Sequence, residues 1–179
     1  MLAIAIISVR RASETITQEA LATSLAENKA AISEIEQYLR QFPEDLLTFS
    51  HSPPIQGIIR AVDNGGVDPE SNDSFGVWAD RLNAIFAAAE IHKQVYNQLR
   101  YLDENGNELV RVDFDFGEIT VLTGTDQLQN QSRRPYFTET RELPHDGVLV
   151  SDLNLNREFG EIEVPYVPVL RYSTPIYDQ

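Results

Sequence analysis

The spacing of apolar residues changes at about Tyr96, from a helical period to an alternating one. Residues 12–42 contain no glycine or proline, and their apolar residues recur three, four or seven positions apart, as on one face of a long helix. This stripe consists of Leu21, Leu25, Ile32, Ile35 and Leu39. It suits either a coiled-coil seam or a helix face lying on a domain, and the sequence leaves both open.

Residues 42–45 predict a break in this helix, because Pro43 and the acids that follow it suit the first turn of a new helix. The second helix is expected to run from Asp45 to Arg60 with an interruption at residues 51–54 (HSPP), and a polar loop of Gly, Asn, Asp and Pro follows it. A third helix is predicted over residues 74–90. Its apolar face consists of Trp78, Leu82, Ile85, Phe86 and Ala89.

The second half of the chain has the pattern of short strands. Residues 99–116 predict a hairpin around Asn105-Gly106, and residues 119–122 either a third strand or a loop. Residues 127–139 look helical although Pro135 interrupts them. Further strands are expected over 147–151 and 163–177, the latter with prolines typical of an edge. Helices followed by strands indicate an α+β fold with an antiparallel sheet.

Composition narrows the class of protein. The 179 residues are 42% hydrophobic, enough for one packed domain, or one domain with a long helix. The 14 basic and 28 acidic residues give a net charge of −14, which excludes a general nucleic-acid partner and disfavours docking on anionic lipids. The absence of cysteine excludes disulfides, thiolate metal sites and cysteine nucleophiles.

The first nine residues form an apolar run that ends at Arg10-Arg11. This run is shorter than the roughly 20 apolar residues of a membrane-spanning helix, and the positive charge follows it instead of preceding it as in a signal peptide. Two interpretations remain: the end of a transmembrane helix, or a strand or helix buried in a soluble fold.

Motifs for phosphate binding, paired-histidine metal binding and serine hydrolysis are missing from the sequence. Asp113 and Asp115 alternate on a strand, so their carboxylates could converge on a hard cation, or simply face solvent beside buried neighbours. The loop with Asp63, Asp68 and Asp73 could wrap Ca²⁺ but lacks the spacing of a calcium loop, and a polar turn is favoured.

Two segments carry candidate ligand-binding residues. In residues 133–137 (RRPYF), Arg134 could pair with a small carboxylate while Tyr136 and Phe137 cover its carbon skeleton. In residues 151–160, Asn154 and Asn156 are expected to face one side of the chain. Asp152 lies beyond them.

Taken together in order, these segments resemble the double Cache (PAS-like) sensors found in the extracytoplasmic region of bacterial histidine kinases and diguanylate cyclases. The resemblance covers residues 21–179 and is carried by 53–61 (PPIQGIIRA), 63–66 (DNGG), Trp78, 81–86, 100–103 (RYLD), 106–112 (GNELVRV), 128–129, 134–137 (RPYF), 155–160 (LNREFG), 162–165 (IEVP), 168–171 (PVLR) and 174–178 (TPIYD).

This resemblance implies a long helix leaving the membrane and a membrane-distal PAS-like sheet with a pocket. Residues 1–9 would be the end of a transmembrane helix, 10–62 a helical region, and 63–179 the distal sensor domain without its last strand. The region would lie in the periplasm of a protein anchored in the inner membrane, with a kinase or cyclase output domain elsewhere. It would form a homodimer through the N-terminal helix and need no cofactor.

Amino-acid-binding members carry an Arg-x-Trp-Tyr step, with which residues 134–137 align through Tyr136 and Phe137 in place of Trp and Tyr. The family's downstream Tyr and Asp fall near Asn154 and Asn156. Losing that Asp removes the partner of a ligand's ammonium, so the resemblance implies an anionic or neutral ligand held by Arg134.

We therefore expect a non-enzymatic ligand-sensing input domain. Its candidate binding residues are Arg134, Tyr136, Phe137, Asn154, Asn156, Asp152, Arg111 and Tyr172. One alternative is a periplasmic protein-interaction module with a vestigial pocket. Another is a metal-dependent hydrolase using Asp113 and Asp115, which lacks a supporting histidine or nucleophile.

Overall fold

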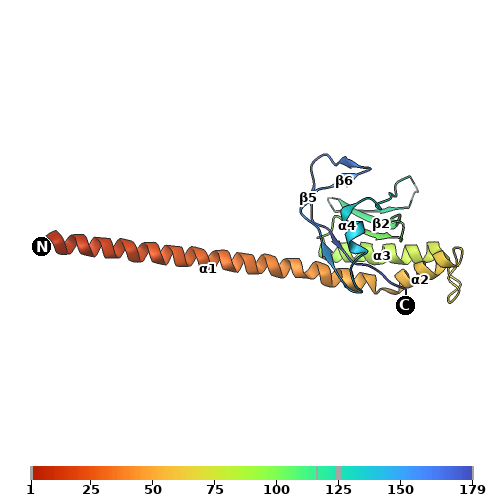
Figure 1. The fold of residues 1–179 in the computed structure, drawn as a ribbon, viewed down its shortest axis with the longest axis horizontal. Coiled ribbons are helices and arrows are strands. Elements are labelled where there is room, and N and C mark those ends of the chain that lie inside the picture. Colours follow the sequence, from red (N-terminus) through yellow and green to blue (C-terminus); the bar gives the residue numbers. More distant parts are fainter. Residues whose placement is uncertain (1, 116, 124–125, 179) are drawn as a thin grey trace. The chain divides into compact units, whose positions relative to one another are not determined.

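The computed structural model describes residues 2–115, 117–123 and 126–178, with side chains from residue 11 onward. Its helices are α1 (Leu2–Ser50), α2 (Pro53–Asp63), α3 (Phe75–Lys93) and α4 (Pro135–Thr140). Its strands are β1 (Gln98–Leu102), β2 (Glu108–Asp115), β3 (Glu118–Leu122), β4 (Leu149–Val150), β5 (Asn154–Leu155), β6 (Arg157–Glu158), β7 (Glu161–Ile162), β8 (Pro168–Val169) and β9 (Tyr172–Ser173). The predicted α+β class is confirmed (Figure 1).

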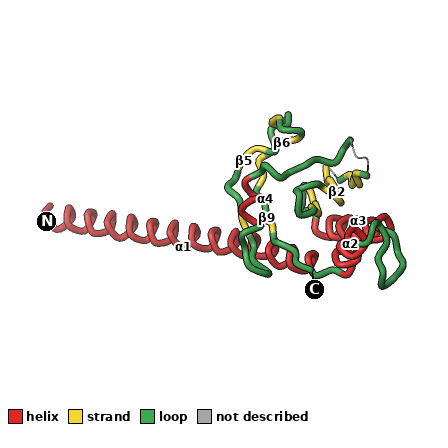
Figure 2. The backbone as a smooth tube through the Cα atoms, turned by 45° about the vertical axis from the view of Figure 1, so that its right-hand side comes forward, coloured by secondary structure: helices red, strands yellow, loops and turns green. Residues whose placement is uncertain are grey.

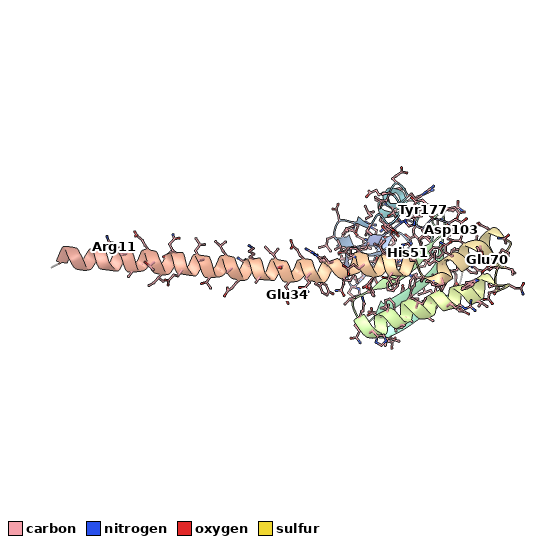
Figure 3. The ribbon with its side chains drawn as sticks, turned by 90° about the horizontal axis from the view of Figure 1, so that it is seen from below. Arg11, Glu34, His51, Glu70, Asp103 and Tyr177 are labelled. Carbon is pink, nitrogen blue, oxygen red and sulfur yellow. The ribbon has the colours of Figure 1, made fainter. Side chains whose placement is uncertain are left out.

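The chain divides into two compact units, residues 1–42 and 43–179. The first unit is the greater part of α1, and Figure 3 shows side chains such as Arg11 and Glu34 standing out from it. The predicted stripe lies open on this helix: Leu25 is 60% exposed and Ile35 59% exposed. Among the residues described, no helix is long and apolar enough to cross a membrane. The side chains of the apolar run at 1–9 lie outside the description, so its membrane role stays a prediction.

The predicted break at Pro43 is wrong, because α1 continues through this proline to Ser50. A proline inside a helix removes one backbone hydrogen bond, but it does not have to end the helix. The interruption predicted at residues 51–54 is confirmed: the break falls at His51-Ser52, and the next two residues, Pro53 and Pro54, occupy the first turn of α2. Proline is favoured there, since first-turn amides have no partner within the helix.

The sheet of the second unit has the order β1-β2-β3, with antiparallel neighbours. Helices α2 and α3 lie along one of its faces, as Figure 1 shows. The apolar core fills this interface, and its most buried members are Ile55, Ile58, Leu82, Val110 and Val112. The predicted hairpin is confirmed, and residues 119–122, for which the sequence left a strand or a loop open, belong to the third strand.

The segment before α4 differs from its predicted helical form. Helix α4 begins only at Pro135, and Arg134 before it is extended, as residues before proline usually are. The backbone of residues 129–131 instead bonds to the β1–β2 turn region: Glu108 donates to the carbonyl of Gln129, and Gln131 donates to that of Gly106. These bonds hold the segment against the edge of the sheet. In Figure 2, α4 lies between the sheet and the chain that carries β5 and β6.

Helices α2 and α3 approach most closely at Gly57. A Cβ atom added there would lie 2.3 Å from two ring carbons of Trp78. The indole cannot easily move aside, because its Nε1 donates to the fully buried carboxylate of Asp68 at 3.1 Å. Glycine at this position therefore sets the distance between the two helices.

Replacing Gly57 with Ala should destabilise the domain by about 1–3 kcal/mol, the usual cost of overpacking a core. The measurement is urea unfolding followed by Trp78 fluorescence. Gly76→Ala in α3 is the control, since its Cβ would meet only the Ser74 hydroxyl at 3.7 Å. That variant should be neutral or stabilised by up to ~1 kcal/mol. Equal effects in both variants would show that contact with the indole is not the constraint.

Candidate ligand-binding site

The second face of the sheet is polar, and a β-bulge adds Glu108 to it. Tyr101 pairs with Val110, but Leu102 pairs with Glu108, so Leu109 is an extra residue on β2. Because side chains alternate along a strand, one extra residue brings Glu108 and Arg111 to the same face. Their charged groups lie 3.6 Å apart there. The bulge thus places an acid beside an arginine that regular alternation would put on opposite faces.

Arg111 is buried, with only 3% of its surface exposed. Its Nε and Nη2 donate to the two carboxylate oxygens of Asp113 at 2.8 and 2.7 Å. Its Nη1 donates to Glu158 at 2.9 Å. The residue directly opposite on β1 is Arg100, so two like charges face each other across the strands. This arrangement requires carboxylates between them.

Glu158 supplies such a carboxylate from β6. Its Oε1 accepts hydrogen bonds from Arg100 at 3.0 Å, Gln98 at 3.0 Å and Asn156 at 3.1 Å. Its Oε2 accepts from Arg111 and from the side chain of Gln129. Both oxygens are therefore surrounded by donors, two of which are cationic.

These contacts control the ionisation of Glu158. Burial raises the pKa of its carboxyl group, but the Gln98 hydrogen bond and the charges of Arg100 and Arg111 outweigh burial and lower the pKa to about 2. Burial likewise lowers the pKa of the Arg111 guanidinium, but Asp113 and Glu158 outweigh it, and the net shift is upward. Both groups are charged at neutral pH.

Asn156 connects this cluster to a second arginine. Its side-chain oxygen accepts from Arg171 at 3.0 Å, and its nitrogen donates to Glu158 and to Glu163. Arg171 also donates to Asn154 at 2.6 Å, which confirms that the two asparagines face one side. The guanidinium of Arg171 lies 5.6 Å from the centre of the Tyr136 ring. Burial raises the pKa of the Tyr136 hydroxyl, and the charges of Arg100, Arg171 and Arg134 oppose this shift.

A cavity of about 310 Å³ opens next to this network. One wall is the segment before α4, with Leu128, Gln129, Asn130, Gln131 and Arg134. The other wall is the tip of the β6–β7 hairpin, with Arg157, Phe159 and Gly160. This volume is at the small end of ligand pockets. The residues that line it include two arginines and no acid.

Arg134 has no carboxylate within ion-pair distance in the described parts of the chain. This distinguishes it from Arg100 and Arg111, which are both paired with acids. A guanidinium that lines a cavity and retains its binding capacity is suited to a planar anion.

The other predicted binding residues occupy different places. Phe137 is buried in the domain, and the guanidinium of Arg141 lies 5.7 Å from its ring centre. Asp152 is exposed on the loop between β4 and β5. Tyr172 pairs with Val150 in β9, and burial raises the pKa of its hydroxyl. None of the three lines the cavity described above.

The proposed metal sites are not supported. Both oxygens of Asp113 are bonded to Arg111, so the pair with Asp115 is not available to a cation. Asp68 is buried against Arg60, and Asp73 is bonded to Arg81. Among the described residues, no group of three or more His, Cys, Asp or Glu side chains could hold a metal ion.

Sequence reasoning missed Arg100, Glu158 and Arg171 as parts of this site. Arg100 could have been found, because polar Gln98 and Arg100 alternate with apolar Leu99 and Tyr101, as a strand with one polar face would. Glu158 offers no such signal, since its partners lie 47 and 58 positions away in the sequence.

Glu158 should make the free energy of unfolding depend on pH in the acidic range. Because its pKa is lower in the folded chain than its ordinary value of 4.5, its contribution is complete above about pH 5 and is lost as the pH falls toward 2. A shift from 4.5 to about 2 corresponds to about 3 kcal/mol. Glu158→Gln should remove this part of the pH dependence in urea unfolding at pH 7, 5 and 3.

Glu161→Gln is the matched control, because Glu161 lies on the same hairpin and is exposed. It should retain the slope of the parent chain. If Glu158→Gln also retains that slope, the carboxylate of Glu158 is not the group that the arginines stabilise.

Comparison with known proteins places the fold. The sequence model of the family "Bacterial histidine kinase, sensor domain" matches residues 78–179. Two crystal structures are similar, each with a TM-score of 0.67 over 81% of this chain. One, 22% identical, is a domain of a protein described as sensory box/GGDEF family from Vibrio parahaemolyticus. The other, 23% identical, is the extracellular domain of a protein described as a histidine kinase.

The chain spans about half of each of these structures, 50% and 47% of their lengths. A search of curated proteins finds no match. The family match covers more than half of the chain and includes β1–β3, Arg134 and Glu158. The chain belongs to the bacterial histidine kinase sensor domain family.

Proposed function

We propose that this chain is the extracytoplasmic input domain of a membrane-bound receptor and binds a small anion in the cavity beside α4. The observation that carries the proposal is the composition of the cavity wall. In a protein of net charge −14, the described wall has two arginines, three amide side chains and no acid. Such a wall attracts anions and offers no partner to a cation.

The ligand is held in this proposal by Arg134, with amide groups from Gln129, Asn130 and Gln131 beside it. Arg171 and Tyr136 lie nearby and add positive charge and an aromatic surface. Because Asn156 stands where amino-acid sensors of this kind carry an Asp, a carboxylate without an α-ammonium fits better than an amino acid.

The domain transmits a signal in this proposal but catalyses no reaction. Ligand binding would change the packing of the second unit, and α1 would carry that change to an output domain, a kinase or a cyclase. The exposed stripe on α1 would pair with the same stripe of a second copy at the inner membrane.

Exposed apolar residues favour a second candidate function, the binding of another protein. Leu153, Val164 and Tyr166 are each at least 70% exposed on the chain between β4 and β8. Exposed apolar groups of this kind favour protein contact. In that case the domain is a periplasmic interaction module, and its pocket has no ligand.

Arg134→Ala should abolish ligand binding. The measurement is a thermal-shift screen of small carboxylates, phosphate, amines and amino acids. A carboxylate hit at ten times its Kd should raise Tm by about 3–6 °C in the parent chain and by less than 1 °C in the variant. Arg133→Ala is the control, because the side chain of Arg133, although next to Arg134 in the sequence, is exposed and does not line the cavity. A hit that survives Arg134→Ala, or a screen without any hit, contradicts the pocket assignment.

Charging the stripe should prevent dimerisation. The double variant Leu25→Glu and Ile32→Glu places acids in the exposed stripe and should give a monomer in sedimentation velocity where the parent chain dimerises. Thr23→Glu with Ala30→Glu is the control, because these positions lie on nearly the opposite side of the helix. If both pairs behave alike, α1 does not associate through the stripe.

A further inference from the structure

The β6–β7 hairpin, residues 157–162, is attached to the sheet mainly through one side chain. Its tip is exposed, with Phe159 at 68% and Ile162 at 39%. In the described parts of the chain, the hairpin bonds to the sheet and to the segment before α4 through the Glu158 carboxylate and through the amide of Phe159, which donates to the side chain of Gln129 at 2.8 Å. A hairpin held by polar contacts at one carboxylate can detach at much lower cost than one packed by apolar groups.

The carboxylate of Glu158 is bound as a ligand carboxylate would be. Two guanidinium groups and three amide groups surround it, from Arg100, Arg111, Gln98, Gln129 and Asn156. Four of these five residues lie on elements outside the hairpin or its flank: β1, β2 and the segment before α4. The sheet therefore holds a carboxylate-shaped site that the hairpin fills.

Charge balance supports the same conclusion. The network contains the guanidinium groups of Arg100, Arg111 and Arg171, and the carboxylates of Glu108, Asp113, Glu158 and Glu163. Arg134 adds a fourth positive charge near Tyr136. With Glu158 in place, the positive and negative charges are equal in number. Without Glu158, the site carries one excess positive charge.

We propose that the space between Arg100 and Arg111 is a carboxylate-binding subsite and that Glu158 fills it as a displaceable internal anion. A ligand carboxylate replaces Glu158, and the β6–β7 hairpin is then released. Because Phe159 and Gly160 also form one wall of the Arg134 cavity, this release opens the cavity to a longer or doubly charged ligand. The inference rests on the proposed function and adds to it the ligand's functional group and the moving element.

Free propionate has the same carbon chain and carboxylate as the glutamate side chain, so it can test the subsite directly. The parent chain should respond to propionate only at much higher concentrations than Glu158→Ala, because the tethered Glu158 carboxylate competes with an effective concentration on the order of millimolar or higher. Glu158→Ala should melt lower, and propionate should restore about 4 °C at ten times its Kd. Propionamide and sodium chloride at equal ionic strength should restore nothing.

The control variant is Glu161→Gln, which removes one negative charge from the exposed side of the same hairpin. It should melt like the parent chain with and without propionate. Equal responses to propionate in the parent chain, Glu158→Ala and Glu161→Gln would overturn the subsite, as would no response in Glu158→Ala.

Hydrogen–deuterium exchange of Glu158→Gln tests the release of the hairpin, with a substitution that preserves the size of the side chain. Amides of residues 157–163 should exchange about tenfold faster, while those of β1–β3 should be unchanged. Uniform acceleration through the sheet would show that Glu158 is only a structural member, and an unchanged hairpin would show that Glu158 does not hold it.

The two proposals can fail separately. If propionate rescues Glu158→Ala while every screening hit survives Arg134→Ala, the subsite stands and the Arg134 pocket is wrong. If Arg134→Ala abolishes the hits while Glu158→Ala behaves like Glu161→Gln, the sensing pocket stands and the displaceable anion is wrong.

Discussion

The buried guanidinium of Arg111 is the constraint on which the second face of the sheet depends. A charge that is 3% exposed must be surrounded by carboxylates, and two of these, Asp113 and Glu108, are close to Arg111 in the sequence. The bulge at Leu109 turns Glu108 toward it, and the β6–β7 hairpin adds Glu158. Charge compensation thus attaches the later part of the chain, which has only short strands, to the sheet.

This arrangement also explains how an acidic protein of net charge −14 can present a positive pocket. Four of its arginines lie at this site: Arg100 and Arg111 are matched by acids, while Arg134 lines a cavity and Arg171 bonds to two asparagines. The chain is a sensor domain of the histidine kinase type. A site whose balance depends on one internal carboxylate is suited to sensing, because an external anion can take its place.

Much of the fold could be predicted from periodicity, since helical and alternating patterns are local. The long helix, the third helix and the β1–β3 hairpin and strand all follow from such patterns. The helix break predicted at Pro43 was wrong, because the low helix propensity of one residue does not end a long helix. The helix predicted over residues 127–134 was wrong, because backbone hydrogen bonds from this segment to the β1–β2 turn override its helical composition. At the site, Arg134 and Tyr136 could be selected because an arginine lies beside aromatic residues in one short segment, and Asn154 and Asn156 because they alternate after a predicted strand. Glu158 could not, because its role arises only when distant segments meet.

The most direct measurement is a crystal structure of the chain grown with propionate at a concentration above the effective concentration of the tethered Glu158 carboxylate, refined at a resolution that separates the Glu158 side chain from a bound carboxylate. The structural interpretation predicts propionate oxygens bonded to Arg100 and Arg111, with Glu158 turned away and the hairpin displaced. Propionate bound elsewhere at full occupancy, with Glu158 still bonded to both arginines, would contradict it.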